Sequence, residues 1–246
     1  MEPTPQHRFR ELHPVGLRGP AIASVAALAF YFFSVDSSPF WGDSASFASH
    51  LDTSPKPFAR SYWLYKSLGR LLVFFGAEPA LAANLASAIF GAASVGTVWA
   101  VVQRLTGKAF AATGAAASLA VAHTFWFHSS VAEVYSLHAL FELLLIYFAL
   151  GASRRARDAM ALGFVAGLAL NHHRLIYFSL AALLPFLALE LRGRAQRAAW
   201  GRLALGLCLG ALPWLALCLR FPPSALEPPV GITAGQLWLQ KTFFGG

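Results

Sequence analysis

Residues 80–100, ALAANLASAIFGAASVGTVWA, decide the fold. The stretch carries no charged side chain, and a helix of this length, at about 1.5 Å per residue, crosses a hydrocarbon layer of about 30 Å. Its Ala, Gly and Ser residues allow neighbouring helices to approach closely in a bilayer. The stretch therefore predicts a membrane helix inside a compact bundle.

The rest of the chain has the same character. Of its 246 residues, 57% are hydrophobic and 12% are charged, whereas soluble domains carry about a quarter charged residues. Further apolar segments lie at residues 20–35, 80–102, 109–126, 132–151, 159–172, 175–191 and 203–219. We predict an all-α polytopic membrane bundle with about seven transmembrane helices. The first span is expected to be retained, because no small-residue cleavage site follows it.

The net charge of +8 follows the predicted membrane topology. With the N-terminus inside, the cytoplasmic loops hold more Arg and Lys than the outer loops, as the positive-inside rule requires. No nucleic-acid partner is needed to explain the charge. We expect a cytoplasmic arm at residues 1–19, a membrane domain at 20–219 with an outer loop at 36–79, and an outer tail at 220–246. The expected location is a bacterial inner membrane, with membrane lipid as a partner and the functional face outward.

The outer loop begins with FWGDSASF, residues 40–47. Asp43 is either a solvated loop acid or an acid held at the bilayer surface for chemistry. The loop continues as RSYWLYKSLGRLLVFFG, residues 60–76, which predicts an amphipathic helix in the headgroup layer. Arg60, Lys66 and Arg70 on this helix are interfacial cations that could bind a lipid phosphate or simply attract anionic lipid.

A second polar cluster occurs in HSSVAEVYSLHA, residues 128–139. Glu133, Tyr135 and His138 lie at the outer mouth of the predicted fourth span. Ionisable residues at a membrane helix are costly to bury and often functional. These three residues are therefore candidate binding residues.

Glu133 also has a purely structural interpretation. Its carboxylate could complement the dipole at the start of the helix, with Ser129 or Ser130 as the N-cap. Glu142, farther inside the span, needs either a partner within the bundle or a proton.

The third cluster is LALNHHRLIYF, residues 168–178. Arg174 is a candidate phosphate ligand, because a guanidinium offers paired donors to phosphate oxygens. Adjacent histidines point about 100° apart on a helix, so His172 and its neighbour are poor joint ligands for one metal. A zinc site with His50, Asp52 or His128 stays open as an alternative. No metal or other cofactor is required, although a divalent metal is not excluded.

Together these motifs resemble a known family. They are the Asp-Ser loop after the first span, YKSLGRLL (65–72), ANLASAIFGA (83–92) and TFWFHSSVAEVYSLHALF (124–141). In this order the chain is similar to the DUF2723 family, whose members include TMEM260-type protein O-mannosyltransferases of the GT-C class of membrane glycosyltransferases. The resemblance spans residues 22–190 and is most specific at Phe125–Trp126 and Ala132–Tyr135.

The resemblance implies a GT-C-like fold and a glycosyltransferase. Such an enzyme moves a hexose, here expected to be mannose, from a polyprenyl-phosphate sugar to a hydroxyl of a protein or glycan acceptor on the outer face. An Asp in the first outer loop acts as base or orients the acceptor, and Asp43 occupies that position. The other expected site residues are Glu133, Tyr135, His138 and His172 in the cleft and Arg174, Arg60 and Arg70 near the donor phosphate.

The chain departs from the family pattern at two points. The family places an acid where this chain has Ser46, and a His-Pro-Pro-Gly-Tyr-Pro-like stretch where it has residues 54–59, SPKPFA. These differences leave a non-catalytic lipid-linked-sugar binder, a transporter or a decayed transferase as the alternative, with a structural subunit third. Family members are generally longer, which leaves open a partial protein.

Overall fold

The computed structural model describes residues 12–40, 43–52, 62–170, 172–192 and 196–220. These residues form helices joined by turns, with no strand among them. The helices are α1 (Arg18–Phe32), α2 (Asp43–Asp52), α3 (Trp63–Phe74), α4 (Pro79–Thr106), α5 (Ala109–Val121), α6 (His123–Ser130), α7 (Tyr135–Gly151), α8 (Ala156–Ala169), α9 (Leu175–Glu190) and α10 (Arg197–Arg220). The all-α prediction is confirmed for the described part of the chain.

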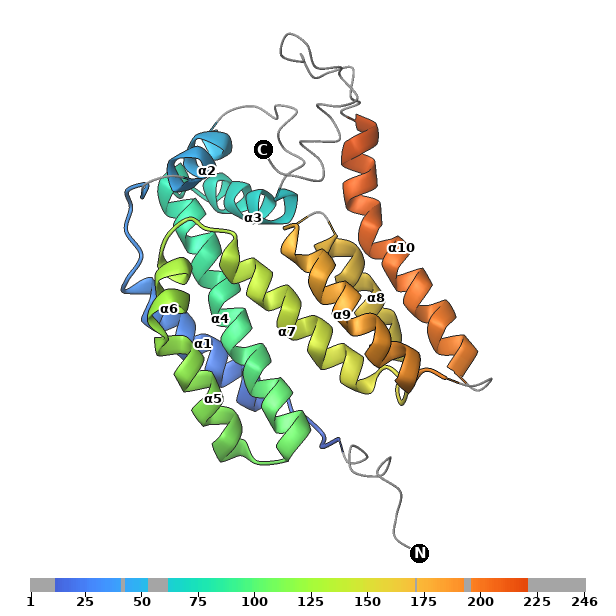
Figure 1. Cartoon of the computed structure of the whole chain (residues 1–246). Coiled ribbons are helices and arrows are strands. Elements are labelled where there is room, and N and C mark those ends of the chain that lie inside the picture. The colour runs from blue at the N-terminus through green and yellow to red at the C-terminus, as the bar shows by residue number, and fades with distance from the viewer. Residues whose placement is uncertain (1–11, 41–42, 53–61, 171, 193–195, 221–246) are drawn as a thin grey trace, which may run out of the picture.

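Each predicted apolar segment coincides for most of its length with one or two of these helices. The segment at 109–126 is divided between α5 and α6, which are bent by 63° at the break between them. The predicted outer loop contains α2 and α3, which lie together at one end of the bundle near the beginning of α4 (Figure 1). We call this the α2–α3 end.

The opposite end is where α4, α7 and α9 finish and α5, α8 and α10 begin (Figure 1). It carries a set of cations in the turns and helix ends, namely Arg104, Lys108, Arg154, Arg155 and Arg157. We call it the basic end. The charge asymmetry between the two ends is that expected of a chain oriented by the positive-inside rule.

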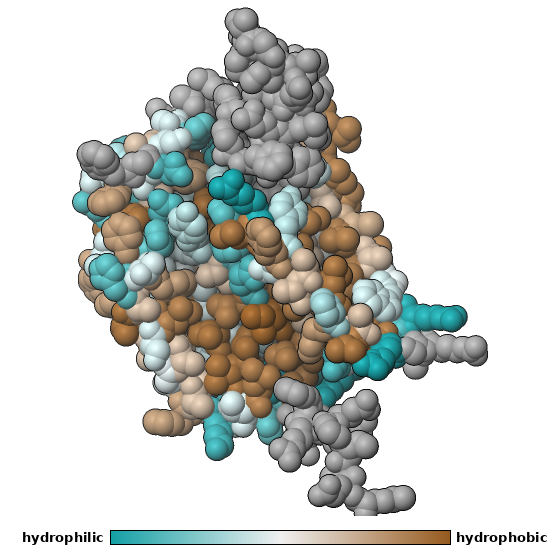
Figure 2. Space-filling view, viewed as in Figure 1, coloured by the Kyte–Doolittle hydropathy of each residue, from teal (hydrophilic) through white to brown (hydrophobic). Residues whose placement is uncertain are grey.

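The predicted number of membrane spans is not supported. Within the part of the chain that the structure describes, two helices, α4 and α10, are long and apolar enough to cross a membrane, and the bent pair α5 and α6 makes three if it counts as one span. The apolar helices α1, α7 and α9 are shorter, and 15 residues of α1 reach only about 22 Å of a layer of about 30 Å. A broad apolar surface nevertheless crosses the lower part of the molecule (Figure 2), consistent with membrane association.

The long helix α4 is the centre of the bundle, and its small residues let other helices approach closely. A Cβ atom at Gly96 would lie 2.7 Å from the Pro20 carbonyl oxygen of α1, and one at Gly91 would lie 2.7 Å from the Ser129 Cβ of α6. Contacts this close require glycine. The prediction of a tightly packed, small-residue helix is confirmed here.

Glycines also allow α8 and α10 to approach closely, and here both helices contribute them. A Cβ atom at Gly163 or Gly167 of α8 would lie 2.8 Å from a backbone nitrogen of α10. Conversely, a Cβ atom at Gly206 of α10 would lie 2.8 Å from the Phe164 nitrogen of α8. Two glycines four residues apart on each helix therefore bring the two backbones together, as in small-xxx-small membrane interfaces.

Replacing Gly163 with alanine is therefore expected to destabilise the protein by about 1–3 kcal/mol, because the added methyl group overpacks the contact with α10. Gly201 of α10 provides the matched control, since a Cβ atom there meets nothing within 4 Å. Gly201→Ala should leave stability unchanged or raise it by up to about 1 kcal/mol. Thermal unfolding of both variants in detergent measures the difference, and equal effects would contradict the close α8–α10 contact.

Candidate functional site

The polar residues singled out in the sequence gather at the α2–α3 end around one short turn. This turn, residues 131–134, joins α6 to α7. Ser44 of α2 donates to the Ala132 carbonyl oxygen at 3.0 Å, and His172, between α8 and α9, contacts the Val134 carbonyl oxygen through Nε2 at 3.1 Å. Both side chains are buried. The turn is thus held from two sides by elements distant in the sequence.

Glu133 is held by a third element, α4. The hydroxyl oxygen of Ser87 accepts from the Glu133 backbone nitrogen at 3.0 Å and also lies 3.0 Å from its carbonyl oxygen. Tyr65 of α3 orients this serine, with its own hydroxyl 2.9 Å from Ser87 Oγ and 2.6 Å from the Ala83 carbonyl oxygen. Buried polar groups satisfied in this way specify one backbone arrangement. The position of the Glu133 backbone is therefore fixed before any ligand binds.

Asp43 and Glu133 lie near each other at this end. Asp43 is exposed in the first turn of α2, where the helix dipole favours a negative charge. Burial raises the pKa of the half-buried Glu133, and the Asp43 carboxylate raises it further, while the Val134 backbone N–H lowers it. Two acids in different environments are suited to different roles: Asp43 is exposed, whereas Glu133 is half-buried and holds its proton more strongly.

The raised pKa of Glu133 predicts a pH-dependent stability difference in Glu133→Gln. In wild type the group favours folding below its unfolded pKa, and this contribution is lost as pH rises through the folded pKa. Glutamine carries no such charge. The variant should therefore unfold at the same temperature as wild type in acid and at a higher temperature at neutral and alkaline pH. Unfolding scans across pH test this, and a constant difference at all pH values would contradict it.

Tyr62 lies just before α3, within electrostatic reach of the acids and of Arg174. Its backbone is left-handed, with φ of 56° at the start of α3, a conformation uncommon for a side chain of this size. Its ring contacts Phe47 and His172, with centroids 5.7 and 5.8 Å away. Burial raises the pKa of Tyr62, Asp43 raises it further, and Arg174 opposes the change. Asp43 and Arg174 are therefore both within electrostatic reach of this phenol.

The cations predicted to bind phosphate do not all meet at this point. Arg174 is exposed just before α9 and acts on Tyr62. Arg70 lies on α3, where it acts on Lys66, one turn earlier. Arg60 lies outside the described residues. Of these two described cations, Arg174 acts on Tyr62, as Asp43 and Glu133 also do.

Lys66 is a residue that sequence reasoning misjudged. It was expected to be an interfacial cation, yet it is 5% exposed on the buried side of α3, beside Tyr65 and Gly69. Burial lowers the pKa of Lys66 to about 8, and Arg70 lowers it further. The available signal was its position next to Tyr65 and three residues before Gly69, which puts it on the same helix face.

The histidines form a second layer beneath the turn. His138 stacks on His172 at 6.2 Å between centroids and lies 5.4 Å from His173. Glu142 has partners inside the bundle, as it required: its Oε1 accepts from Ser179 at 2.5 Å and lies 3.4 Å from His138 Nε2. His138 and Glu142 are thus joined to each other, one turn apart on α7.

His172 is neutral and has a defined tautomer. Burial lowers its pKa to about 3, with further lowering from His138 and His173 and an opposing effect of the hydrogen bond to Val134. Because a carbonyl oxygen only accepts, the Nε2 atom of His172 must carry the hydrogen. Its Nδ1 atom is buried with no hydrogen-bond partner among the described residues. The sequence predicts His172 as part of the polar wall of the cleft. In the structure its hydrogen bond to Val134 orients the 131–134 turn.

Tyr135 packs against His128 and also acts on Tyr62. Its ring lies 4.9 Å from His128 and 5.8 Å from His173. Tyr135 and His128 line a cavity of about 390 Å³, together with Ala122, Thr124 and Phe125. Part of the predicted cleft wall therefore lies on the α6 side of the turn.

Two alternatives from the sequence are not supported by this geometry. Ser129 and Ser130 bond to the carbonyl oxygens one turn earlier in α6 and do not cap α7. Within the described residues, no three His, Cys, Asp or Glu side chains come together as metal ligands. Neither the helix-cap interpretation of Glu133 nor the suggested zinc cluster receives support.

Comparison with known proteins gives the chain its family. No solved structure matches it. The family model described as the N-terminal domain of protein O-mannosyl-transferase TMEM260 matches residues 50–196. The matched region contains the 131–134 turn, the histidine layer and Arg174, and begins after Asp43. Since the match covers more than half of the chain, this protein belongs to the TMEM260 N-terminal domain family of protein O-mannosyl-transferases.

Proposed function

We propose that this protein is a GT-C-type membrane glycosyltransferase that moves mannose from a polyprenyl-phosphate donor to a hydroxyl of a protein or glycan acceptor. The observation that carries the proposal is the 131–134 turn at one end of the bundle: Ser44, next to Asp43, and His172, two residues before Arg174, both contact the backbone on either side of Glu133. Family membership supports glycosyl transfer. We place this reaction on the outer membrane face, because the cations collect at the opposite end.

Each of these charged groups suits one part of the transfer. Asp43 takes the proton of the acceptor hydroxyl while the oxygen of that hydroxyl forms a bond to C1 of the sugar. The bond from C1 to the phosphate oxygen breaks, and the electron pair leaves with the polyprenyl phosphate. Arg174 stabilises the charge on that leaving group. No metal takes part in this scheme.

Glu133 has a separate role in the proposed reaction. Its pKa is raised, first by burial, so Glu133 holds its proton more strongly than an ordinary carboxyl does. We assign Glu133 to holding the sugar or acceptor by hydrogen bonds, and proton removal to Asp43, which stands at the position of the family's loop acid. The fixed backbone of the 131–134 turn keeps this carboxyl in place.

The test is turnover of radiolabelled polyprenyl-phosphate mannose by the purified protein in lipid, with a Ser/Thr-containing peptide acceptor. Label transferred to the peptide, or donor hydrolysed in its absence, supports the proposal. Donor binding without either reaction would favour the non-catalytic binder.

One feature of α2 keeps the binder as the second candidate. Ser46, which stands where the family has an acid, lies one turn after Asp43, with its hydroxyl 3.4 Å from His50 Nδ1. A hydroxyl cannot supply the negative charge of the missing acid. If turnover is absent, Ser46→Glu is the variant with which to seek its restoration.

A further inference from the structure

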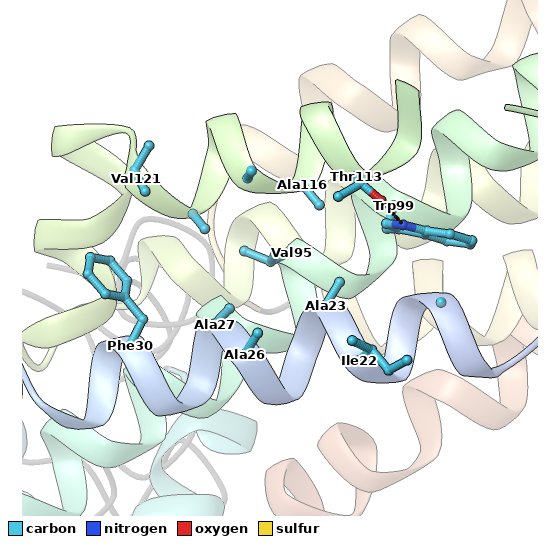
Figure 3. Close-up of a pocket in the computed structure, with 13 residues that line it drawn as sticks. Ile22, Ala23, Ala26, Ala27, Phe30, Val95, Trp99, Thr113, Ala116 and Val121 are labelled. Atoms are coloured by element: carbon cyan, nitrogen blue, oxygen red, sulfur yellow. Dashed lines mark hydrogen bonds between the residues drawn. The ribbon is translucent and has the colours of Figure 1, made fainter. Parts of the chain in front are cut away.

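A second, apolar groove runs along α1, α4 and α5, and it faces the membrane side of the bundle. Its volume is about 450 Å³. Figure 3 shows small side chains of α1 and α5 along its length, with Trp99 and Thr113 at one end and Phe30 and Val121 at the other. The Trp99 indole donates to Thr113 at 3.2 Å. None of the residues within electrostatic reach of Tyr62 lines it.

The length of the groove corresponds to one leaflet of a bilayer. Its lining on α1 extends from Gly19 to Phe30, a separation of about 16 Å along a helix. This is about half of a hydrocarbon layer of about 30 Å. An acyl chain of one leaflet fits this dimension, whereas a polyprenyl chain is much longer.

The side chains beside the groove indicate that it opens to lipid. Ile22 is 70% exposed on α1, and Phe110 in the first turn of α5 is 93% exposed. Large apolar side chains this exposed, next to an apolar groove, are typical of a surface that meets a membrane. The occupant of the groove therefore comes from the bilayer.

Two cations flank the basic end of the groove. Arg18 precedes Gly19 on α1, and Lys108 precedes Thr113 by five residues, about 7.5 Å along α5. Both side chains are exposed, and neither forms an ion pair with any other described residue. The two positive charges lie beyond the same end of the groove, where a headgroup phosphate would lie if a chain filled it.

We propose that the groove binds one acyl chain of an anionic phospholipid, with its phosphate between Arg18 and Lys108. Basic residues between helices on the cytoplasmic side are suited to anionic headgroups. The apolar walls of the groove can take up the acyl chain without burying an unpaired polar group. The site is separate from the candidate active site and independent of the transfer reaction. It would hold a structural lipid of the inner leaflet.

Native mass spectrometry of the purified protein with phosphatidylglycerol tests the charge requirement, with phosphatidylcholine as the neutral probe. Wild type should prefer phosphatidylglycerol, and Arg18→Gln with Lys108→Gln should bind it about 30-fold more weakly. The matched control is Arg155→Gln with Arg202→Gln, which removes two exposed cations elsewhere. An equal loss in the control, or no preference for the anionic lipid in wild type, would overturn the proposal.

A second pair of variants tests the groove itself. Ala26 and Ala29 are both exposed on α1, but Ala26 lines the groove and Ala29 does not. Ala26→Phe should fill the groove and reduce phosphatidylglycerol binding at least tenfold, whereas Ala29→Phe should not. Thermal unfolding of both variants checks that they fold. If the folded Ala26→Phe variant binds the lipid as wild type does, the groove is not the site.

Discussion

Asp43→Asn is expected to lower the rate of mannose transfer by about 10²–10⁴-fold, the usual contribution of a general base. The asparagine keeps the size and hydrogen-bonding shape of the side chain but cannot accept the acceptor's proton. Donor binding should change little, because the donor phosphate is assigned to Arg174. The measurement is kcat and KM for transfer to a peptide, together with donor binding to the same preparation.

Asp36→Asn supplies the matched control for this experiment. Asp36 is an exposed acid in the same loop, and its carboxylate bonds locally to Ser37 and Ser38, including the Ser38 backbone nitrogen at 3.1 Å. Its replacement should leave transfer unchanged. Equal activity of Asp43→Asn and wild type would remove Asp43 from the chemistry and leave Glu133 as the acid to examine next.

The largest expected effect on stability is at the basic end. Asp158→Asn should lower the free energy of unfolding by about 3–5 kcal/mol, because it leaves the buried Arg104 guanidinium without its counter-charge. Arg104 and Asp158 form an ion pair with side chains 3% and 5% exposed. Arg104 also donates to the Tyr147 carbonyl oxygen at 2.9 Å and lies 4.5 Å above its ring. The pair therefore joins α4, α7 and α8.

Two variants distinguish this ion pair from a general charge effect. Arg157 is 80% exposed and lies 3.7 Å from the same Asp158, so Arg157→Gln should cost at most about 1 kcal/mol. The double variant Arg104→Met with Asp158→Leu should recover most of the lost stability, since no buried charge remains unpaired. Reversible unfolding in mixed micelles measures all three. A loss as large in the double variant as in Asp158→Asn would contradict this explanation.

Helix boundaries show how far the sequence pattern reaches. The segment predicted at 132–151 forms α7 from Tyr135, because residues 131–134 are a turn. The stretch at 203–219 extends back to Arg197 in α10, since charged residues continue a helix that leaves the apolar layer. Hydropathy locates the apolar part of a helix, and hydrogen bonding decides where the helix begins.

The candidate site shows more clearly which contacts the sequence pattern cannot predict. The sequence placed Asp43, Glu133 and Arg174 on one side of a membrane bundle, because each lies at the edge of an apolar segment. It could not show that Ser44, Ser87 and His172 hold the same turn, because these residues are 38 to 88 positions from the groups they contact. The burial of Lys66 also depends on how α3 packs against α4, and its place on the helix face of Gly69 was only an indirect signal of it.

The sequence by itself determined that this is an all-helical, membrane-associated protein with one basic end, and its motifs indicated the family. These properties depend on local composition and on the distribution of charged residues between loops, both of which can be read directly from the sequence. Only the tertiary structure decided which helices meet through glycine, which charges are buried as a pair, and which polar groups hold the 131–134 turn. These depend on contacts between distant residues, because a side chain's environment is set by the neighbours that packing brings to it.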